Sequence, residues 1–246
     1  MNYLHMAKLS LVPPNADFKL KSPLMLALDH DDPAFIENLT DELADVVGCF
    51  KLGPRLVYRM GQAWTRKIAD KAPLFIDCKF FDIPSTMESS VRTAFEMGAT
   101  FCTIHAMAGP EALKRLAEVE KELAKIRPFK ILNVTILTSW DQHSFSPNFV
   151  NLPPEKHVEI LVDQVQQAGM DGVVCSPHEL KLLEGRGLYL VTPGIRMSME
   201  AAQDQKRIMG PAEALKAGAS AFVVGRPILQ AENPREAALD YAITML

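Results

Sequence analysis

Eight short apolar runs recur along the chain, and they are the feature that most constrains its fold. The segments between them carry apolar residues at helical spacing; most of these segments open with Pro, Asp or Ser, and several close at Gly. Runs this apolar suit parallel strands that are covered on both faces, and alternation of strands and helices is typical of βαβ units. The runs span residues 24–29, 46–51, 74–79, 100–106, 130–138, 171–176, 188–194 and 219–225.

The chain length is compatible with either two small domains or one barrel-sized domain, since it has 246 residues. Eight strand and helix units favour the second choice, because a closed (β/α)₈ barrel has about 250 residues. The sequence therefore predicts an α/β protein, a single-domain (β/α)₈ TIM barrel over residues 22–246. Residues 1–21 are expected to form an N-terminal extension outside it.

The charge balance excludes some classes of partner. The chain has 26 Lys and Arg residues against 30 Asp and Glu residues, a formal net charge of −4. A general nucleic-acid or membrane-surface binder would show a basic excess, so we expect neither partner. A phosphorylated small molecule remains possible, because it needs only one or two local cations. The start of the chain lacks the features of a signal peptide, which favours a cytoplasmic protein.

The four cysteines, Cys49, Cys78, Cys102 and Cys175, lie far apart, each inside an apolar run and with no C-x-x-C pair. They are predicted to be buried, reduced thiols.

Charged residues at the ends of the first three predicted strands indicate a functional site. Asp29 ends the first run, Lys51 the second, and Asp77 and Lys79 the third, with Asp82 in the next loop. Asp77 and Lys79 are two residues apart and should share one face of their strand, while Cys78 faces the other way. Burying such charges is costly unless function requires it.

Two carboxylates beside Lys79 are expected to keep its ammonium protonated, which makes it an acid rather than a nucleophile. A Schiff-base lysine needs an apolar or cationic environment that lowers its pKa. The sequence therefore favours proton donation over class I aldolase chemistry.

A phosphate site is predicted at the seventh and eighth strands. Gly194 and Arg196 follow the seventh run, and Gly225 and Arg226 follow the eighth. Barrels frequently bind phosphate with the loops after these two strands. An arginine in each loop supplies donors that match phosphate oxygens.

Two long polar connections, 139–154 and 196–211, follow the fifth and seventh strands, at the end where barrels carry their active-site loops. The histidines show no metal-ligand spacing, and His105 is expected to be a hydrogen-bonded structural residue. With no dinucleotide or P-loop motif either, no metal and no cofactor is predicted.

The segment FIDCKFFDIPST resembles a known family. Its residues Asp77, Lys79, Asp82, Ile83, Pro84 and Thr86 match the D-x-K-x-x-D-I-P-x-T signature of the orotidine 5′-phosphate decarboxylases. The likeness runs in order over residues 24–246, through LALD, FKLG, NVTILTS, VTPGIR, DQKRIM and VVGRPI. This resemblance implies that orotidine 5′-phosphate loses CO₂ to give uridine 5′-phosphate (UMP), the last step of de novo UMP synthesis, without metal or organic cofactor. It also implies a homodimer whose active sites are shared across the interface.

The resemblance also assigns roles to individual residues. Asp29 and Lys51 would hold ribose hydroxyls, Lys79 would protonate C6 as CO₂ departs, and Asp77 would face the substrate carboxylate. Lys51 and Asp82 would belong to the catalytic set with them. Asp82, Ile83 and Thr86 would be contributed to the partner's site, and residues 196–211 would close as a lid. The remaining substrate contacts would be Thr138 and Ser139 at the pyrimidine, Arg196, Gln205, Gly225 and Arg226 at the phosphate, and Pro193.

Two other functions stay open at this point. One is a related barrel decarboxylase that acts on a keto-sugar phosphate with Mg²⁺. The other is a catalytically silent nucleotide-binding protein. The keto-sugar-phosphate reaction is disfavoured by the matches at Ile83-Pro84, Gln205 and the pyrimidine loop. A silent binding protein is disfavoured by intact Asp77, Lys79 and Asp82.

Overall fold

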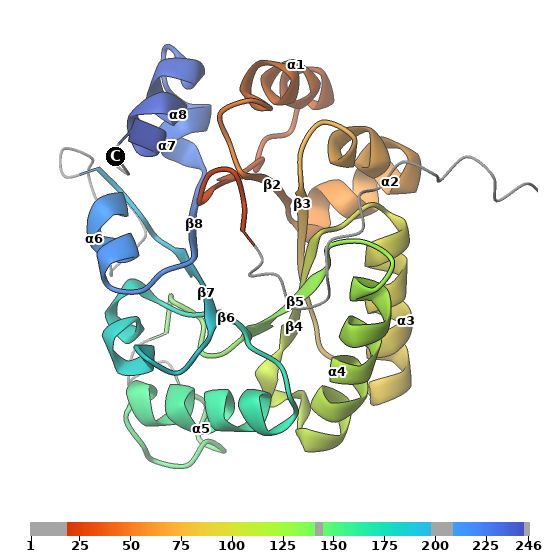
Figure 1. Cartoon of the computed structure of the whole chain (residues 1–246), viewed down its shortest axis with the longest axis vertical. Helices are drawn as coiled ribbons and strands as arrows, with labels where there is room; N and C mark the ends of the chain where they lie inside the picture. Colours follow the sequence, from red (N-terminus) through yellow and green to blue (C-terminus); the bar gives the residue numbers. More distant parts are fainter. Residues whose placement is uncertain (1–18, 141–144, 198–208, 244–246) are drawn as a thin grey trace, which may run out of the picture.

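The computed structural model describes residues 19–140, 145–197 and 209–243. Eight parallel strands pair in chain order and close into a barrel, because β1 pairs with both β2 and β8 (Figure 1). This confirms the predicted (β/α)₈ architecture. The strands are β1 (Leu24–Ala27), β2 (Cys49–Leu52), β3 (Leu74–Phe80), β4 (Phe101–His105), β5 (Lys130–Val134), β6 (Gly172–Val174), β7 (Tyr189–Pro193) and β8 (Ala221–Val224).

Helices surround the strands, and almost all of them start at a proline. Proline is favoured at the first helical position because its fixed φ suits a helix and its missing N–H would lack an intrahelical partner there. In α7 the proline is the second residue instead. The helices are α1 (Pro33–Leu43), α2 (Pro54–Ala69), α3 (Pro84–Glu96), α4 (Pro110–Ala124), α5 (Pro154–Gln167), α6 (Pro211–Lys216), α7 (Arg226–Leu229) and α8 (Pro234–Ile243).

One predicted unit differs from the others. Two short 3₁₀ helices, η2 (Pro177–Glu179) and η3 (Lys181–Leu183), stand between β6 and β7 where the regular alternation predicts an α-helix. The carboxylate of Glu179 turns back to accept a hydrogen bond from the backbone N–H of Ser176 at 2.8 Å. This bond favours a tight turn, and Gly185 and Gly187 then adopt positive φ before β7 begins. A further 3₁₀ turn, η1 (Ala106–Ala108), follows β4.

The apolar core has two layers. The larger layer lies between the strands and the helices and includes Leu26, Phe50 and Ile104. The smaller layer fills the barrel interior with Met25, Cys49, Phe75, Phe101, Leu132, Val191 and Ala221. Side chains alternate along each strand, so successive residues serve the two layers in turn. The interior is packed toward the amino ends of the strands, and a cavity remains at their carboxyl ends.

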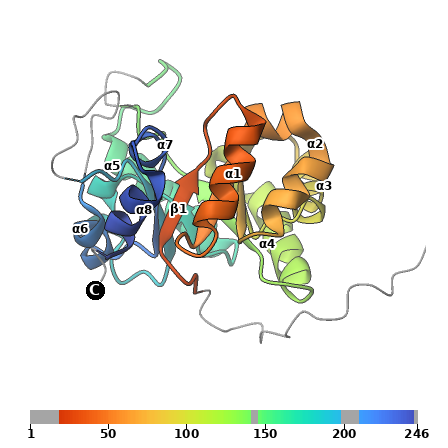
Figure 2. The ribbon, with the colours of Figure 1, turned by 90° about the horizontal axis from the view of Figure 1, so that it is seen from above.

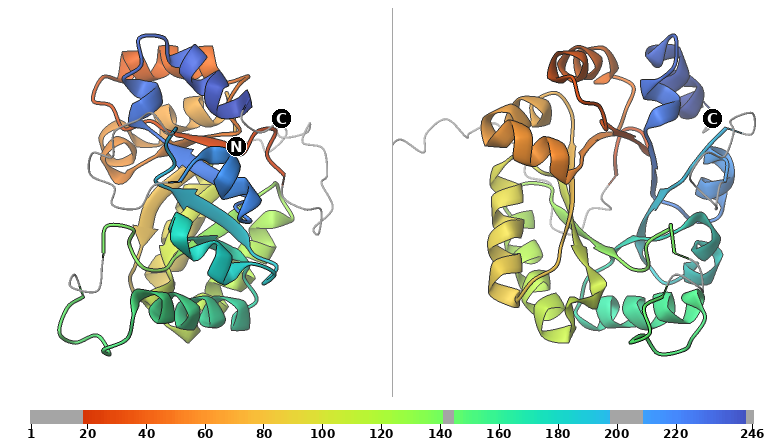
Figure 3. Two further views of the ribbon diagram at one scale, coloured as in Figure 1. Left: turned by 90° about the vertical axis from the view of Figure 1, so that its left-hand side faces the viewer. Right: turned by 180° about the vertical axis from the view of Figure 1, so that it is seen from behind.

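The first and last helices close the outer ring. α1 and α8 pack side by side (Figure 2). Arg235 of α8 forms a salt bridge with Asp45, just after α1, with its Nη2 2.6 Å from a carboxylate oxygen. The connection between β5 and α5 extends beyond the barrel (Figure 3). Among the residues described, no helix is long and apolar enough to cross a membrane.

Candidate active site

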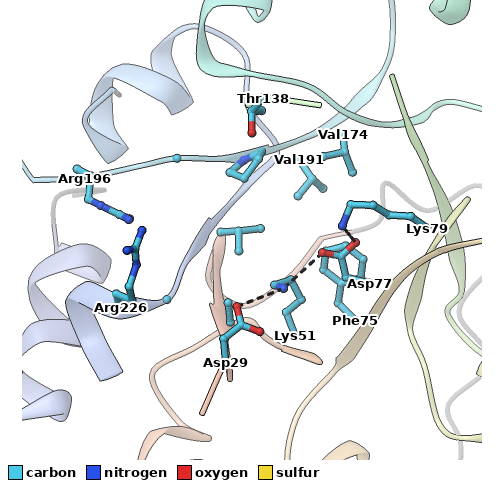
Figure 4. Close-up of a pocket in the computed structure, with 15 residues that line it drawn as sticks. Asp29, Lys51, Phe75, Asp77, Lys79, Thr138, Val174, Val191, Arg196 and Arg226 are labelled. Carbon is cyan, nitrogen blue, oxygen red and sulfur yellow. Dashed lines mark hydrogen bonds and ion pairs between the residues drawn. The ribbon is translucent and has the colours of Figure 1, made fainter. Parts of the chain in front are cut away.

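A cavity of about 410 Å³ opens at the carboxyl ends of the strands. Its wall collects residues from nearly the whole circumference of the barrel (Figure 4). This is where βα loops of such barrels carry their active sites. The lining residues are Ala27, Asp29, Lys51, Phe75, Asp77, Lys79, Thr138, Val174, Val191, Pro193, Gly194, Arg196, Val223, Gly225 and Arg226.

Strand β3 brings Asp77 and Lys79 to the cavity as the alternation predicts. Phe75, Asp77 and Lys79 face the barrel interior, whereas Cys78 packs in the outer apolar layer. The half-buried Cys78 thiol has its pKa raised to about 11, mainly by burial. All four cysteines are free, and Cys49, Cys102 and Cys175 are fully buried, as predicted for reduced thiols. None of them is an ionised nucleophile near neutral pH.

Four side chains from β1, β2 and β3 form a chain of alternating charges (Figure 4). The ammonium of Lys79 lies 2.8 Å from Oδ1 of Asp77. The ammonium of Lys51 lies 3.4 Å from Oδ2 of the same carboxylate and 3.8 Å from Oδ2 of Asp29. The Lys51 and Asp77 side chains are only 11% and 15% exposed, and Lys79 is 40% exposed. The more accessible ammonium at the end of the chain therefore belongs to Lys79.

The carboxyl group of Asp77 stays ionised although it is buried. Burial alone would raise its pKa, but the charges of Lys51 and Lys79 and hydrogen bonds from Lys79 and Thr103 outweigh that effect and lower it. Asp77 thus holds a permanent negative charge against the cavity.

Thr103 of β4 is part of this network, and the strand-end pattern did not single it out. Its hydroxyl oxygen lies 3.0 Å from Oδ1 of Asp77 and accepts a hydrogen bond from the backbone N–H of Lys79 at 2.8 Å. Lys79 has φ of 49°, the only positive φ of a non-glycine residue in the described ranges. A threonine inside an apolar strand gives no sequence signal for such a contact, because the contact depends on how β3 and β4 align.

Two arginines occupy the other side of the cavity, Arg196 just after β7 and Arg226 just after β8 (Figure 4). Gly194 turns the chain out of β7 with φ of 85°, a conformation that favours glycine. Arg196 follows it; its backbone N–H donates to the carbonyl of Met209 at 3.1 Å, and its Nη1 donates to the carbonyl of Ile195. Arg226 is the first residue of α7 and lines the cavity next to Gly225. The four residues predicted for a phosphate site therefore line the same cavity: Gly194, Arg196, Gly225 and Arg226.

The pyrimidine positions are only partly within the cavity wall. Thr138 lines the cavity, and so does Pro193. Ser139 follows Thr138 in the chain but is absent from the cavity wall formed by the described residues. Gln205 and most of the expected lid, 198–208, lie outside the described residues.

The second half of the signature lies outside this cavity. Asp82 is exposed, and its Oδ1 accepts a hydrogen bond from the N–H of Ile83 at 2.6 Å. Ile83 caps the start of α3 and is 64% exposed, and Phe81 beside it is 60% exposed. Thr86 stands in the first turn of α3. Phe81, Asp82, Ile83 and Thr86 form an exposed, half-apolar rim, and none of them lines the cavity of their own chain.

An aromatic cluster follows Thr138 in the chain, although neither tryptophan carries a sequence motif. Trp140 packs edge-on against Phe145 and Phe149, with ring centroids 5.4 and 5.8 Å apart. The imidazole of His157 stacks on Phe145 at 4.8 Å and has its Nε2 3.1 Å from the carbonyl oxygen of Val150. The polar composition of 139–154 hides this cluster, because its aromatic residues are spread over 18 positions.

His105 ends β4 close to the charged network. Its Nδ1 accepts a hydrogen bond from the N–H of Met107 at 3.4 Å, and its ring packs against Phe81, in keeping with a structural role. Burial lowers the pKa of His105, and the nearby positive charge of Lys79 lowers it further, so the imidazole is neutral at pH 7. The described part of the chain contains no group of three or more His, Cys, Asp or Glu side chains arranged to hold a metal ion.

Comparison with known proteins gives a consistent match. The model of the orotidine 5′-phosphate decarboxylase / HUMPS family matches residues 22–241. The orotidine 5′-phosphate decarboxylase of Geotalea daltonii is 40% identical over 223 residues, covering 89% of this chain and 93% of the relative. The enzyme of the same name from Rhodopseudomonas palustris is 40% identical over 226 residues, covering 90% and 93%.

Solved structures agree. The crystal structure of orotidine 5′-phosphate decarboxylase from Lactobacillus acidophilus superposes with a TM-score of 0.78 at 32% identity, covering 91% of this chain and 99% of that one. An uncharacterized conserved protein from Geobacillus kaustophilus superposes with a TM-score of 0.77 at 23% identity, which shows a shared fold.

Proposed function

The chain belongs to the orotidine 5′-phosphate decarboxylase / HUMPS family, and on that basis we propose that it converts orotidine 5′-phosphate to UMP and CO₂, with Lys79 as the proton donor. The protein is a carboxy-lyase of de novo pyrimidine biosynthesis. One observation carries this assignment to residues: the Lys79 ammonium is held 2.8 Å from Asp77 at the wall of a cavity whose other side bears two arginines.

Loss of CO₂ from C6 leaves a high-energy carbanion. The bond between C6 and the carboxylate breaks, CO₂ departs, and the electron pair stays on C6 in the ring plane, where the ring π system does not delocalise it. A fixed cation beside C6 must then stabilise the negative charge. Lys79 supplies that positive charge and the proton that C6 accepts, so electrostatic stabilisation and general acid catalysis come from one group.

The neighbouring charges keep Lys79 ready for this role. Asp77, with its lowered pKa, stays ionised and holds the ammonium in place. Asp77 also faces the position proposed for the substrate carboxylate, whose charge disappears as CO₂ leaves. Lys51, between Asp77 and Asp29, compensates the second carboxylate oxygen. Asp29 and Lys51 are proposed to hold the ribose hydroxyls.

Arg196 and Arg226 are proposed to bind the phosphate, with Gly225 allowing close approach of the backbone. A phosphate monoester carries about −1.5 to −2 charges at pH 7, which two arginines match. Thr138, Ser139 and Pro193 are assigned to substrate contacts, and Gln205 is assigned to the phosphate. Phosphate binding far from C6 can order the 196–211 connection over the site, so that remote contacts stabilise the transition state.

An absorbance assay tests the reaction itself. Purified protein with orotidine 5′-phosphate in EDTA should bleach the orotate chromophore and form UMP stoichiometrically. Activity in EDTA supports the proposed independence from metal and other cofactors. Loss of activity on chelation, together with failure to act on orotidine 5′-phosphate, would instead favour the Mg²⁺-dependent keto-sugar-phosphate reaction. UMP binding without any turnover would instead indicate a catalytically silent nucleotide-binding protein.

The protein is further proposed to work as a homodimer that shares each active site. Support comes from the exposed apolar side chains of Phe81 and Ile83 and from Asp82, which is exposed and does not line its own cavity. Asp82, Ile83 and Thr86 would then complete the partner's site.

Mixing two inactive variants tests this sharing. A mixture of Lys79→Ala and Asp82→Ala proteins should regain activity, because each heterodimer contains one site with both native residues. Subunit exchange is checked separately with two affinity tags. Verified exchange without recovered activity would refute the shared site.

The proposed boundaries and location follow the same reasoning. The family model starts at residue 22, which supports a barrel over 22–246 and an extension over 1–21. Four free cysteines support the proposal that the enzyme works in the reducing cytosol.

A further inference from the structure

We infer that Thr103 is a positioning residue for the proton transfer: one hydroxyl fixes both the backbone of Lys79 and the carboxylate of Asp77, and so aims the Lys79 ammonium into the cavity. This inference rests on the proposed decarboxylase function. Thr103 itself is not part of the cavity wall and is fully buried. It acts through the two residues that it holds.

The local backbone shows why Lys79 needs support. β3 and β4 pair regularly at Ile76 with Cys102, but the next pair joins Phe80 to Ile104. Four residues on β3 therefore advance beside two on β4, and the extra residues form a bulge that contains Asp77 and Lys79. Lys79 takes φ of 49° there, a left-handed conformation that is strained for a non-glycine residue.

Thr103 supplies the hydrogen bond that the bulge removes from the strand pairing. The N–H of Lys79 donates to the Thr103 hydroxyl oxygen at 2.8 Å, so a side chain stands where a strand carbonyl would be the acceptor. A buried backbone N–H without an acceptor is costly. The hydroxyl therefore stabilises the left-handed conformation relative to a regular strand.

The direction of each hydrogen bond is fixed by chemistry. An amide N–H only donates and an ionised carboxylate only accepts, so the hydroxyl proton of Thr103 must point to Oδ1 of Asp77, 3.0 Å away. The same Oδ1 accepts from the Lys79 ammonium at 2.8 Å. A closed ring results, running from the Lys79 N–H through Thr103 and Asp77 back to the Lys79 ammonium.

This ring restrains both ends of the lysine. A free lysine side chain has many rotamers, and fixing it in one of them costs entropy. Here the backbone end and the ammonium end are both tied through Thr103 before substrate binds. Proton transfer to C6 needs the ammonium within a narrow range of positions, and a displacement of about 1 Å can lower the rate about 100-fold.

Substitution of Thr103 by valine, with serine as the matched control, tests the inference. Thr103→Val keeps the branched shape and removes the hydroxyl, whereas Thr103→Ser keeps the hydroxyl and removes a methyl group. Thr103→Val should lower kcat about 10- to 100-fold, while KM and UMP affinity change less than about threefold. Thr103→Ser should return kcat to within about threefold of the wild type.

Two further measurements, made beside kcat and KM, separate the possible outcomes. The fraction of folded protein in each variant is measured by thermal melting, and active sites are counted by UMP titration. A kcat of Thr103→Val near that of the wild type would overturn the inference, as would a loss in Thr103→Ser as large as that in Thr103→Val. If Thr103→Val does not fold, Thr103→Ala takes its place under the same criteria. Absence of decarboxylation by the wild-type protein would contradict the proposed function instead.

Discussion

The two sides of the cavity differ in the charged residues that line them. On the β1 to β3 side, Asp29, Lys51, Asp77 and Lys79 pair with one another and sum to zero formal charge. On the β7 to β8 side, the lining residues Arg196 and Arg226 contribute two positive charges. Three of the four residues of the first side lie on β2 and β3, and Lys51 and Asp77 among them are largely buried. On the second side, Arg196 follows β7 and Arg226 is the first residue of α7.

This difference separates two tasks. In the proposed mechanism, reaction at C6 requires a cation whose position does not change, and the ion pairs of Lys79 and Lys51 with Asp77 hold such a cation before substrate arrives. The proposed phosphate binding requires positive charge, which Arg196 and Arg226 bring to the cavity wall. The comparison predicts that substitutions on the first side lower kcat and that substitutions on the second side raise KM.

Lys79→Ala should give the largest effect. Loss of both the proton donor and the charge beside C6 should lower kcat on the order of 10⁴-fold, while the Kd for UMP changes little. The rate of UMP formation at saturating substrate gives kcat, and titration with UMP gives the Kd. A near-normal kcat in this variant would remove Lys79 from the chemistry and end the proposed division of tasks.

Arg226→Ala should act on the other side. It should lower kcat/KM for orotidine 5′-phosphate about 10- to 100-fold, since a hydrogen bond to a charged group contributes about 1.5–3 kcal/mol. Turnover of orotidine, which lacks the phosphate, should be unchanged. Steady-state kinetics with both substrates test this, and equal losses on both would contradict a phosphate role.

Asp77→Asn should show how much the ionised carboxylate of Asp77 contributes to the stability of the fold. Because the folded-state pKa of Asp77 is lowered, its ionised form adds stability that is fully present above the unfolded pKa of about 3.9 and is lost as pH falls through the folded pKa. The variant should lose about 1–3 kcal/mol of unfolding free energy at pH 7. That deficit should shrink below about pH 4.

Urea denaturation from pH 3 to pH 7 measures this deficit. Arg196→Gln, on the other side of the cavity, serves as the control and should show no comparable change between pH 3 and pH 5. A deficit for Asp77→Asn that is constant over the whole range would show that the carboxylate is not coupled in this way.

Trp140→Ala should give the smallest effect, since Trp140 follows Thr138 by two residues but does not itself line the cavity. We expect KM to rise about threefold to tenfold, with kcat near normal. Trp64→Phe is the matched control: the indole N–H of Trp64 donates to Glu37 at 2.6 Å, remote from the cavity wall. A KM increase of the same size in Trp64→Phe would indicate general destabilisation.

The sequence alone predicts the barrel and most of the charged residues that line its cavity. Eight apolar runs locate eight strands, and the two-residue alternation places Asp77 and Lys79 on one face because both features are local. Gly194, Arg196, Gly225 and Arg226 meet because strand order in a barrel is fixed. The 3₁₀ turns after β6 escape prediction, because they depend on the bond between Ser176 and Glu179 rather than on periodicity.

Thr103 could not be predicted for a different reason. Its role depends on the irregular register between β3 and β4 and on the left-handed backbone of Lys79. Neither is encoded in a short segment, since lysine is not a residue that signals positive φ. The cluster around Trp140 is similar, because its partners come from a segment whose composition is typical of an ordinary surface loop.

The pairing of β1 with β8 has a consequence for synthesis of the protein. Leu24 lies opposite Phe222, so the barrel wall closes only after about 200 further residues have left the ribosome. Until then β1 and β7 present open edges that can pair with other chains. Asp29, Lys51 and Lys79 emerge early, but Arg226 follows β8 and arrives last. A nascent chain therefore completes the side of the cavity proposed to bind phosphate only when its exposed edges disappear.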